Sequence, residues 1–170
     1  MQPSDTAYPR LKHGFNHSEL ERWYTPTPEE LVWCSTLIKF EHTRFGFIIL
    51  LKVFQRLGYF VTTPQVPDAV IDHISKTLNQ TLDREQLAAY DVSRIRTNHI
   101  SLIRQHFDVS AFGKEARKLM SKTLADAALT KDDLADIINV GIETLVKHRF
   151  ELPQFGVLLR EAKLQRVAAY

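Results

Sequence analysis

The 170-residue sequence has few of the residues that mark several common protein classes: one cysteine, six glycines and two methionines. A lone Cys34 cannot form an internal disulfide, which excludes a disulfide-stapled secreted miniprotein. The longest apolar run, residues 45–51, is far shorter than the roughly 20 residues of a membrane-spanning helix. The first ten residues are polar rather than signal-like, so we expect a cytoplasmic protein without a membrane partner.

Charge is nearly balanced overall, but it is unevenly placed along the chain. The formal net charge is +2, from 22 Lys and Arg against 20 Asp and Glu, and by itself it indicates no partner. Residues 1–85 carry a net −1 and residues 86–170 a net +3. Positive charge is concentrated in residues 94–122, which contain two acids and seven cations: Arg94, Arg96, Arg104, Lys114, Arg117, Lys118 and Lys122. It indicates either a nucleic-acid surface or a solvated basic helix face.

Helix signals recur along the chain, whereas strand signals are scarce. Thr27-Pro28-Glu29-Glu30 and Thr130-Lys131-Asp132-Asp133 resemble helix N-terminal capping boxes. The spacing of apolar residues predicts helices over 28–40, 44–57, 67–78, 83–90, 93–107, 114–129, 131–148 and from 153 onward. We therefore expect an all-α fold of about seven to eight helices in two tandem, helix-turn-helix-like units. The expected divisions are an arm over 1–24, a first unit over 25–91 and a second over 92–170.

The segment 44–57 is apolar almost all round and is followed by Gly58, which predicts a helix surrounded by others. Its polar residues are expected on a narrow outward strip: Arg44, Lys52, Gln55 and Arg56.

Other reactive side chains have simpler explanations than catalysis. His13 and His17 have a possible metal spacing, but Gly14 lies between them and no third ligand is evident. We expect Cys34 and a hydrogen-bonded His99 in the core. Three acids fit a helix first turn better than a magnesium site: Asp132, Asp133 and Asp136. No Gly-rich phosphate loop, G-x-S-x-G or H-E-x-x-H occurs, so we expect no catalytic residue, metal or cofactor.

Several short segments between about residues 20 and 165 follow one another in the same order as in a known protein family. They are Thr25 to Glu30, Arg44-Phe45-Gly46-Phe47, Leu57-Gly58-Tyr59-Phe60, Val66-Pro67, Tyr90, Arg94, Arg96-Thr97, His99, Ile103-Arg104 and Leu152-Pro153. In this order they resemble the N-terminal region of Tn-three-family transposases, the large enzymes of replicative bacterial transposons.

The resemblance implies a helical DNA-binding region that recognises the terminal inverted repeats of a transposon during DNA transposition and recombination. Its partner would be double-stranded DNA, with self-association through a full-length transposase and a nucleoid location when bound. The metal-binding catalytic domain of those enzymes lies downstream of this region, so the chain is expected not to be an enzyme.

Nine residues are predicted to contact DNA. The resemblance implicates Arg44, Arg94, Arg96, Thr97 and Arg104. Position at the start of helix 93–107 adds Asn98, whose amide can pair with adenine, and the following helix adds Lys114, Arg117 and Lys118 as backbone clamps. Two positions depart from the family pattern. Thr97-Asn98 replaces basic residues, and Asp108 stands where glycine is frequent, which implies weaker binding or altered sequence preference.

Two other classes of function remain open. One is a helical protein–protein interaction or regulatory domain derived from a transposase, favoured by the apolar Phe150 and Phe155. The other is a small enzyme with an unfamiliar site, which would need a deep polar pocket.

Overall fold

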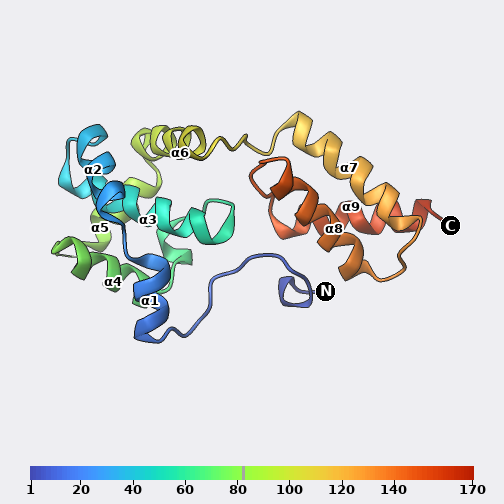
Figure 1. Ribbon diagram of the computed structural model, residues 1–170, viewed down its shortest axis with the longest axis horizontal. Helices are drawn as coiled ribbons and strands as arrows, with labels where there is room; N and C mark the ends of the chain where they lie inside the picture. Colours follow the sequence, from blue (N-terminus) through green and yellow to red (C-terminus); the bar gives the residue numbers. More distant parts are fainter. Residues whose placement is uncertain (82) are drawn as a thin grey trace. The chain divides into compact units, whose positions relative to one another are not determined.

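A computed structural model describes residues 1–81 and 83–170. The described residues form nine α-helices and two short 3-10 helices, without a β-strand (Figure 1). The all-α prediction is confirmed, and the helix count is one above the expected range. None of the described helices is both long and apolar enough to cross a membrane.

The chain divides into two compact units. The larger unit comprises residues 11–103, and the smaller unit comprises residues 1–10 together with 104–170. This division differs from the expected boundary at residue 92 in two ways. Most of α6 belongs to the larger unit, and the first ten residues belong with the C-terminal helices.

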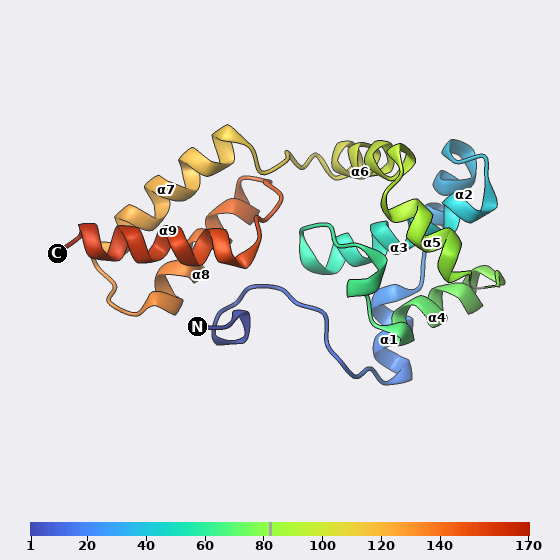
Figure 2. The same cartoon turned by 180° about the vertical axis from the view of Figure 1, so that it is seen from behind.

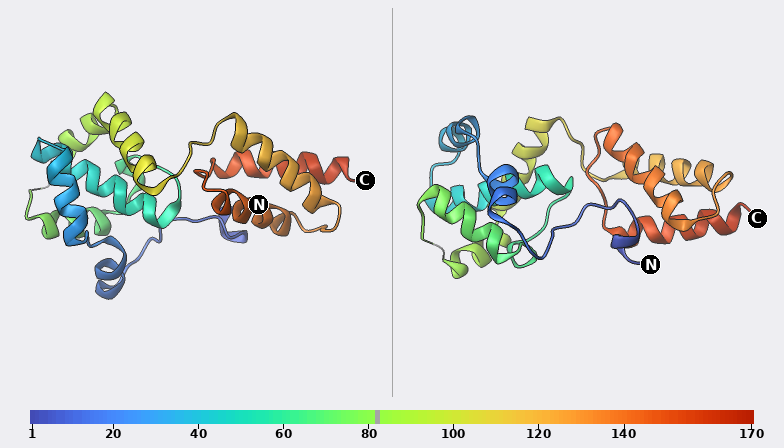
Figure 3. Two further views of the ribbon diagram at one scale, coloured as in Figure 1. Left: turned by 45° about the horizontal axis from the view of Figure 1, so that its top comes forward. Right: turned by 60° about the horizontal axis from the view of Figure 1, so that its bottom comes forward.

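The larger unit is built around one long helix. Its helices are α1 (His17–Tyr24), α2 (Pro28–Leu37), α3 (Glu41–Leu57), α4 (Asp68–Leu78), α5 (Arg84–Asp91) and most of α6 (Arg94–Phe107), with a 3-10 turn at Thr63–Gln65. Within this unit, α3 lies between α6 on one side and α1 and α4 on the other (Figures 1 and 2, and the left view of Figure 3). The surrounded helix that the sequence predicts is therefore present.

Burial in α3 extends even to a charged residue. Twelve of its 17 residues are buried, including Lys52, which is 6% exposed. Lys52 Nζ lies 3.1 Å from Glu30 Oε1, and Gln55 Nε2 donates to Glu30 Oε2 at 2.7 Å. The expectation that Lys52 faces outward is wrong, because the first turn of α2 covers that side of α3. Gln55 and Arg56 are exposed as expected.

The smaller unit contains a bundle of three helices, α7 (Lys114–Ala128), α8 (Leu134–Lys147) and α9 (Phe155–Ala168). Its buried apolar side chains include Met120, Leu124, Ile138, Leu145 and Leu158. The N-cap of α8 is Asp133, whose side chain accepts from the backbone N–H groups of Ala135 and Asp136. The helix therefore begins three residues later than we expected from a cap at Thr130.

The first ten residues pack on this bundle rather than forming part of an arm. The 3-10 turn Pro3–Asp5 is followed by Tyr8, which is 7% exposed and donates its hydroxyl to the carbonyl of Pro153 at 2.6 Å. Ala7 N donates to Asn139 Oδ1 at 2.7 Å, and the rings of Tyr8 and Phe155 meet edge to face. The rest of the expected arm contains α1, which is the additional helix.

Candidate nucleic-acid interface

The first half of α6 is held against α3 and α5 by three aromatic side chains and a glycine. A Cβ atom on Gly46 would lie 2.6 Å from the Tyr90 ring, so only glycine allows this approach. The Tyr90 hydroxyl lies 2.6 Å from His99 Nδ1, and Phe47 meets the His99 ring edge to face. Residues that carry the family resemblance therefore anchor α6.

His99 is the polar group at the centre of this anchor. It is 4% exposed, and burial lowers the pKa of its ring from 6.5 to about 4, so the imidazole is neutral at neutral pH. Burial likewise raises the pKa of the Tyr90 hydroxyl. The prediction of a hydrogen-bonded core histidine is confirmed.

Three of the arginines predicted to contact DNA have partners inside the protein. Arg44 Nε donates to the carbonyl of Ile38 at 2.6 Å, which covers the C-terminal end of α2. Arg96 Nη2 donates to the carbonyl of Val61 at 3.1 Å. Both side chains are half-buried. Their geometry gives them a structural role in orienting α2 and α6.

Arg104 belongs to the smaller unit and has an acidic partner within that same unit. Its Nε and Nη2 donate to Glu151 Oε2 at 2.9 and 2.5 Å, and the two side chains are 30% and 15% exposed. Nearby, Arg149 donates to the carbonyls of Phe107 and Asp108 at the end of α6. The C-terminal end of α6 is therefore fixed to the segment that precedes α9.

Four polar residues in the first two turns of α6 form an exposed face, which we call the α6 face. Its members are Arg94, Thr97, Asn98 and Ser101. Within the described part of the chain, the side chains of Arg94 and Asn98 make no hydrogen bond or ion pair. The sequence Arg94 to Phe107 contains no Asp or Glu. The face therefore offers hydrogen-bond donors and acceptors without negative charge.

The other predicted clamp residues lie on α7. Lys114, Arg117 and Lys118 are exposed, and the Arg117 guanidinium lies 5.3 Å from the centre of the Phe112 ring. Lys122 is also exposed but pairs with Asp126 at 3.2 Å. The first two turns of α7 thus present three cations near its start.

The sequence prediction missed Ser101 and the exposed apolar Ile95, which flank the predicted residues on α6. Ile95 is 41% exposed and Val92, just before the helix, is 87% exposed. A helical wheel of residues 94–101 with the buried His99 as its inward reference would have placed Ser101 beside Arg94.

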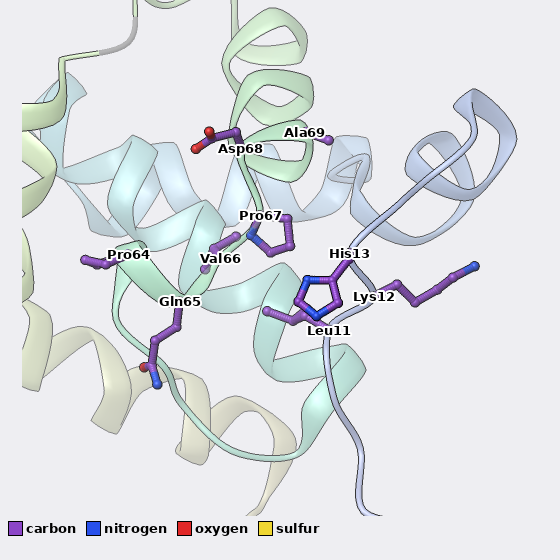
Figure 4. A pocket seen from close by; sticks show the side chains of 9 residues that line it. All are labelled: Leu11, Lys12, His13, Pro64, Gln65, Val66, Pro67, Asp68 and Ala69. Atoms are coloured by element: carbon purple, nitrogen blue, oxygen red, sulfur yellow. The ribbon is translucent and has the colours of Figure 1, made fainter. Parts of the chain in front are cut away.

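A hollow of about 460 Å³ lies in the larger unit between residues 11–13 and 64–69. In Figure 4, His13 and Leu11 lie toward Pro67, whereas the polar ends of Lys12 and Asp68 point in different directions. His13 precedes α1, and His17 in α1 lies 3.6 Å from Glu21. No group of three metal-ligating side chains occurs among residues 1–81 and 83–170.

The three helix-start acids have the structural positions that the sequence indicates, with one difference. Asp133 caps α8 and Asp136 lies in its first turn, whereas Asp132 precedes the helix and accepts from the Tyr170 hydroxyl at 2.7 Å. Cys34 is 3% exposed, and burial raises the pKa of its thiol to about 11. A thiol with this pKa stays protonated at neutral pH and is a poor nucleophile.

The two phenylalanines that favoured a protein-binding surface are less exposed than expected. Phe150 and Phe155 are half-buried, and Phe155 packs on Tyr8 with ring centres 5.6 Å apart. Exposed apolar side chains occur instead at several other places, including Val32, Leu37 and Phe40 on α2 and just after it, and Leu164 and Val167 on α9.

The fold and surface define an all-α protein that displays an acid-free polar helix. A family model described as "Domain of unknown function (DUF4158)" matches residues 3–163, so the chain belongs to this family. No curated protein matches the chain.

Proposed function

We propose that this protein binds double-stranded DNA through the α6 face, as the inverted-repeat recognition region of a Tn-three-like transposase that carries its catalytic domain elsewhere. The observation that carries the proposal is the composition of that face. An ordinary solvated helix face mixes acids with cations, whereas the α6 face combines one arginine with hydroxyl and amide groups. Such groups pair with base edges and phosphates, and the absence of carboxylates avoids repulsion from DNA.

The packing of α6 supports this use. A helix that reads DNA needs a fixed orientation, and His99 with Tyr90 and Arg96 with Val61 fix the buried side. The connection from α5 is short, because Val92 and Ser93 alone separate the two helices. Helix-turn-helix proteins use a comparable short turn before the helix that enters the major groove.

Sequence-independent affinity would come from exposed cations. Arg94 on α6 and the three α7 cations are available for phosphates, whereas Arg44, Arg96 and Arg104 are occupied by internal partners. Four phosphate contacts predict that log K falls with log salt at a slope of about −4, from about −0.9 per contact.

The test is a fluorescence titration of wild-type protein into labelled inverted-repeat duplex and into a randomised duplex pool, at several salt concentrations. Arg94→Ala and Asn98→Ala should each weaken binding by about tenfold, which corresponds to the usual contribution of a base or phosphate contact. The matched control is Lys76→Ala, which removes an exposed cation from α4 in the same unit and should leave the affinity unchanged. Absence of binding at ~10 μM protein in low salt would exclude the proposal, since phosphate contacts are strongest there.

A helical protein–protein interaction domain is the second candidate, and the exposed apolar side chains of α2 favour it. Val32 is 65% exposed, and Phe40, beyond the end of α2, is 63% exposed. Sedimentation with and without duplex separates the two functions. Self-association that Val32→Ser abolishes, without DNA binding, would support this candidate instead.

A further inference from the structure

One exposed aliphatic side chain lies in the first turn of α6, and another lies just before the helix. Val92 is 87% exposed and Ile95 is 41% exposed. Both lie beside Arg94, the cation of the α6 face. Ile95 lies one turn from Asn98 on the surface of α6, so a ligand that binds at Asn98 can also contact Ile95.

Ile95 also forms part of the wall of a small hollow. The hollow has a volume of about 260 Å³, and its other lining residues come from the starts of α3 and α6 and from α5: His42, Thr43, Gln86, Ala89, Tyr90 and Ser93. The side chains of His42 and Gln86 are exposed at this place. A partner that reaches Ile95 would therefore meet hydrogen-bonding groups of α3 and α5 as well as the aliphatic side chain.

The charge around the pair favours DNA as this partner. No acid occurs between Ser93 and Phe107, so a polyanion is attracted by Arg94 and meets no carboxylate on the helix. The major groove of DNA displays one large apolar group, the C5-methyl of thymine. Ile95 and Asn98 are three residues apart and are neighbours on the helix surface, and the amide of Asn98 suits adenine.

We propose that Ile95, assisted by Val92, contacts thymine C5-methyl groups next to the adenine that Asn98 contacts, and so gives the protein a preference for adjacent A·T pairs. This proposal rests on the DNA-binding function proposed above. It assigns sequence preference to aliphatic residues that were not predicted to contact DNA, and it leaves the phosphate contacts to the cations.

The experiment begins by selecting the sequences that the wild-type protein binds from a randomised duplex pool. The selected duplex is then made with each thymine in turn replaced by deoxyuridine, which removes the methyl group and keeps every base-pairing group. Wild-type affinity should fall about fourfold for each contacted methyl, on the usual burial free energy of one such group. The loss should be confined to one or two thymines next to the adenine that Asn98 contacts. That adenine is identified as the one whose replacement weakens binding of the wild-type protein but not of Asn98→Ala.

The variant Ile95→Ala should bind the thymine duplex about fourfold more weakly and should no longer distinguish it from the deoxyuridine duplex. Ile95→Val, which keeps most of the side chain, should retain the distinction. Val32→Ala is the matched control, because it truncates an aliphatic residue of α2 that is 65% exposed in the same unit. It should keep the wild-type distinction in full.

Equal wild-type affinity for the thymine duplex and every deoxyuridine duplex would overturn the proposal while leaving DNA binding intact. A distinction that persists in Ile95→Ala and Val92→Ala would also overturn it, because another residue would then contact the methyl. Failure to bind any duplex in low salt would instead contradict the proposed function itself. The wild-type comparison requires no variant, so misfolding of Ile95→Ala would not prevent the test.

Discussion

The two long helices of the larger unit, α3 and α6, use their sequences in opposite ways. Twelve of the 17 residues of α3 are buried, whereas only His99 and Ile103 are buried among the 14 residues of α6. In α3 even Lys52 is turned inward and paired with Glu30. In α6, a narrow side of the helix is buried against the rest of the unit, and a broad side is exposed to solvent. The contrast indicates that α3 organises the unit and that α6 displays side chains.

The same contrast applies to the arginines. Arg96, on the half-buried side of α6, donates to a backbone carbonyl, whereas Arg94, two residues earlier, is exposed. Similar residue types close together in sequence therefore have different roles. A DNA-binding assay alone would not separate them, because loss of an anchoring arginine would displace α6 and weaken binding indirectly. Stability measurements are needed beside binding measurements.

The largest effect is expected where α3 buries a charge. Glu30→Ala would leave the ammonium group of Lys52 buried without its partner and would remove the carboxylate oxygen that accepts a hydrogen bond from the Thr27 backbone N–H. Burial opposes ionisation of the Glu30 carboxyl, but hydrogen bonds from Thr27, Gln55 and Lys52 outweigh it and lower the pKa of Glu30. We expect a loss of about 4 kcal/mol in the free energy of unfolding, measured by urea denaturation.

The control for this variant is Glu29→Ala, at the preceding exposed position of the same helix turn. It should change the free energy of unfolding by less than about 0.5 kcal/mol. Equal effects of the two substitutions would show that the pair Lys52–Glu30 contributes nothing to the packing of α2 on α3.

The next largest effect is the contribution of His99, which anchors α6, to the free energy of unfolding, and this contribution depends on pH. In the folded protein the pKa of His99 is about 4, below its ordinary 6.5, so the unfolded chain binds more protons between these values. The free energy of unfolding should therefore fall as pH decreases from about 6.5 to 4, by about 3 kcal/mol from this residue. Above about pH 6.5 this contribution should be constant.

Urea denaturation across this pH range can isolate the contribution by comparing wild-type protein with His99→Asn. The variant should be less stable at pH 7 but should show a flatter dependence on pH. Ser101→Ala, which changes an exposed residue of the same helix that does not ionise, should keep the wild-type slope. An unchanged slope in His99→Asn would mean that its ring is not the group that takes up the proton on unfolding.

The helices were predictable from the sequence where a cap and an apolar pattern coincide. The capping box of Thr27 and Glu30 begins α2 as expected. The start of α8 was misplaced because Thr130 and Asp133 are both acceptable caps, and Thr130 instead donates to the carbonyl of Ala127. Helix α1 was missed because nearby prolines and Gly14 indicated an arm, although Asn16 and Glu19 form a capping box.

The candidate site was only partly predictable, for a different reason. The sequence marks α6 as basic, but exposure of each arginine depends on partners far along the chain. The carbonyl that binds Arg96 is 35 residues away, and the carboxylate that binds Arg104 is 47 residues away. Local periodicity contains no information about such partners. Local periodicity was sufficient to predict that His99 is buried and hydrogen-bonded, because a histidine on the apolar face of a helix must find its partner in the core.

The smallest expected effect on stability concerns the C-terminal ends of α3 and α6. Helix α3 ends at Gly58, with φ of 77°, whereas α6 ends at Asp108, with φ of 54°. At Asp108 the N–H groups of residues 108 and 109 donate to the carbonyls of residues 105 and 104, the pattern of a Schellman cap. Glycine adopts this left-handed conformation without strain, so Asp108→Gly should raise the free energy of unfolding by ~0.5 kcal/mol.

A second left-handed residue provides the contrast for this prediction. Arg149 has φ of 60° at the end of α8, but its guanidinium donates to the carbonyls of Phe107 and Asp108. Arg149→Gly would relieve backbone strain and remove these hydrogen bonds, so it should lower the free energy of unfolding by ~1 kcal/mol. Opposite signs for the two substitutions in parallel urea titrations would show that the end of α6 is held by the Arg149 side chain and not by backbone geometry alone. If Arg149→Gly stabilised the protein as Asp108→Gly does, the guanidinium would have no part in fixing α6.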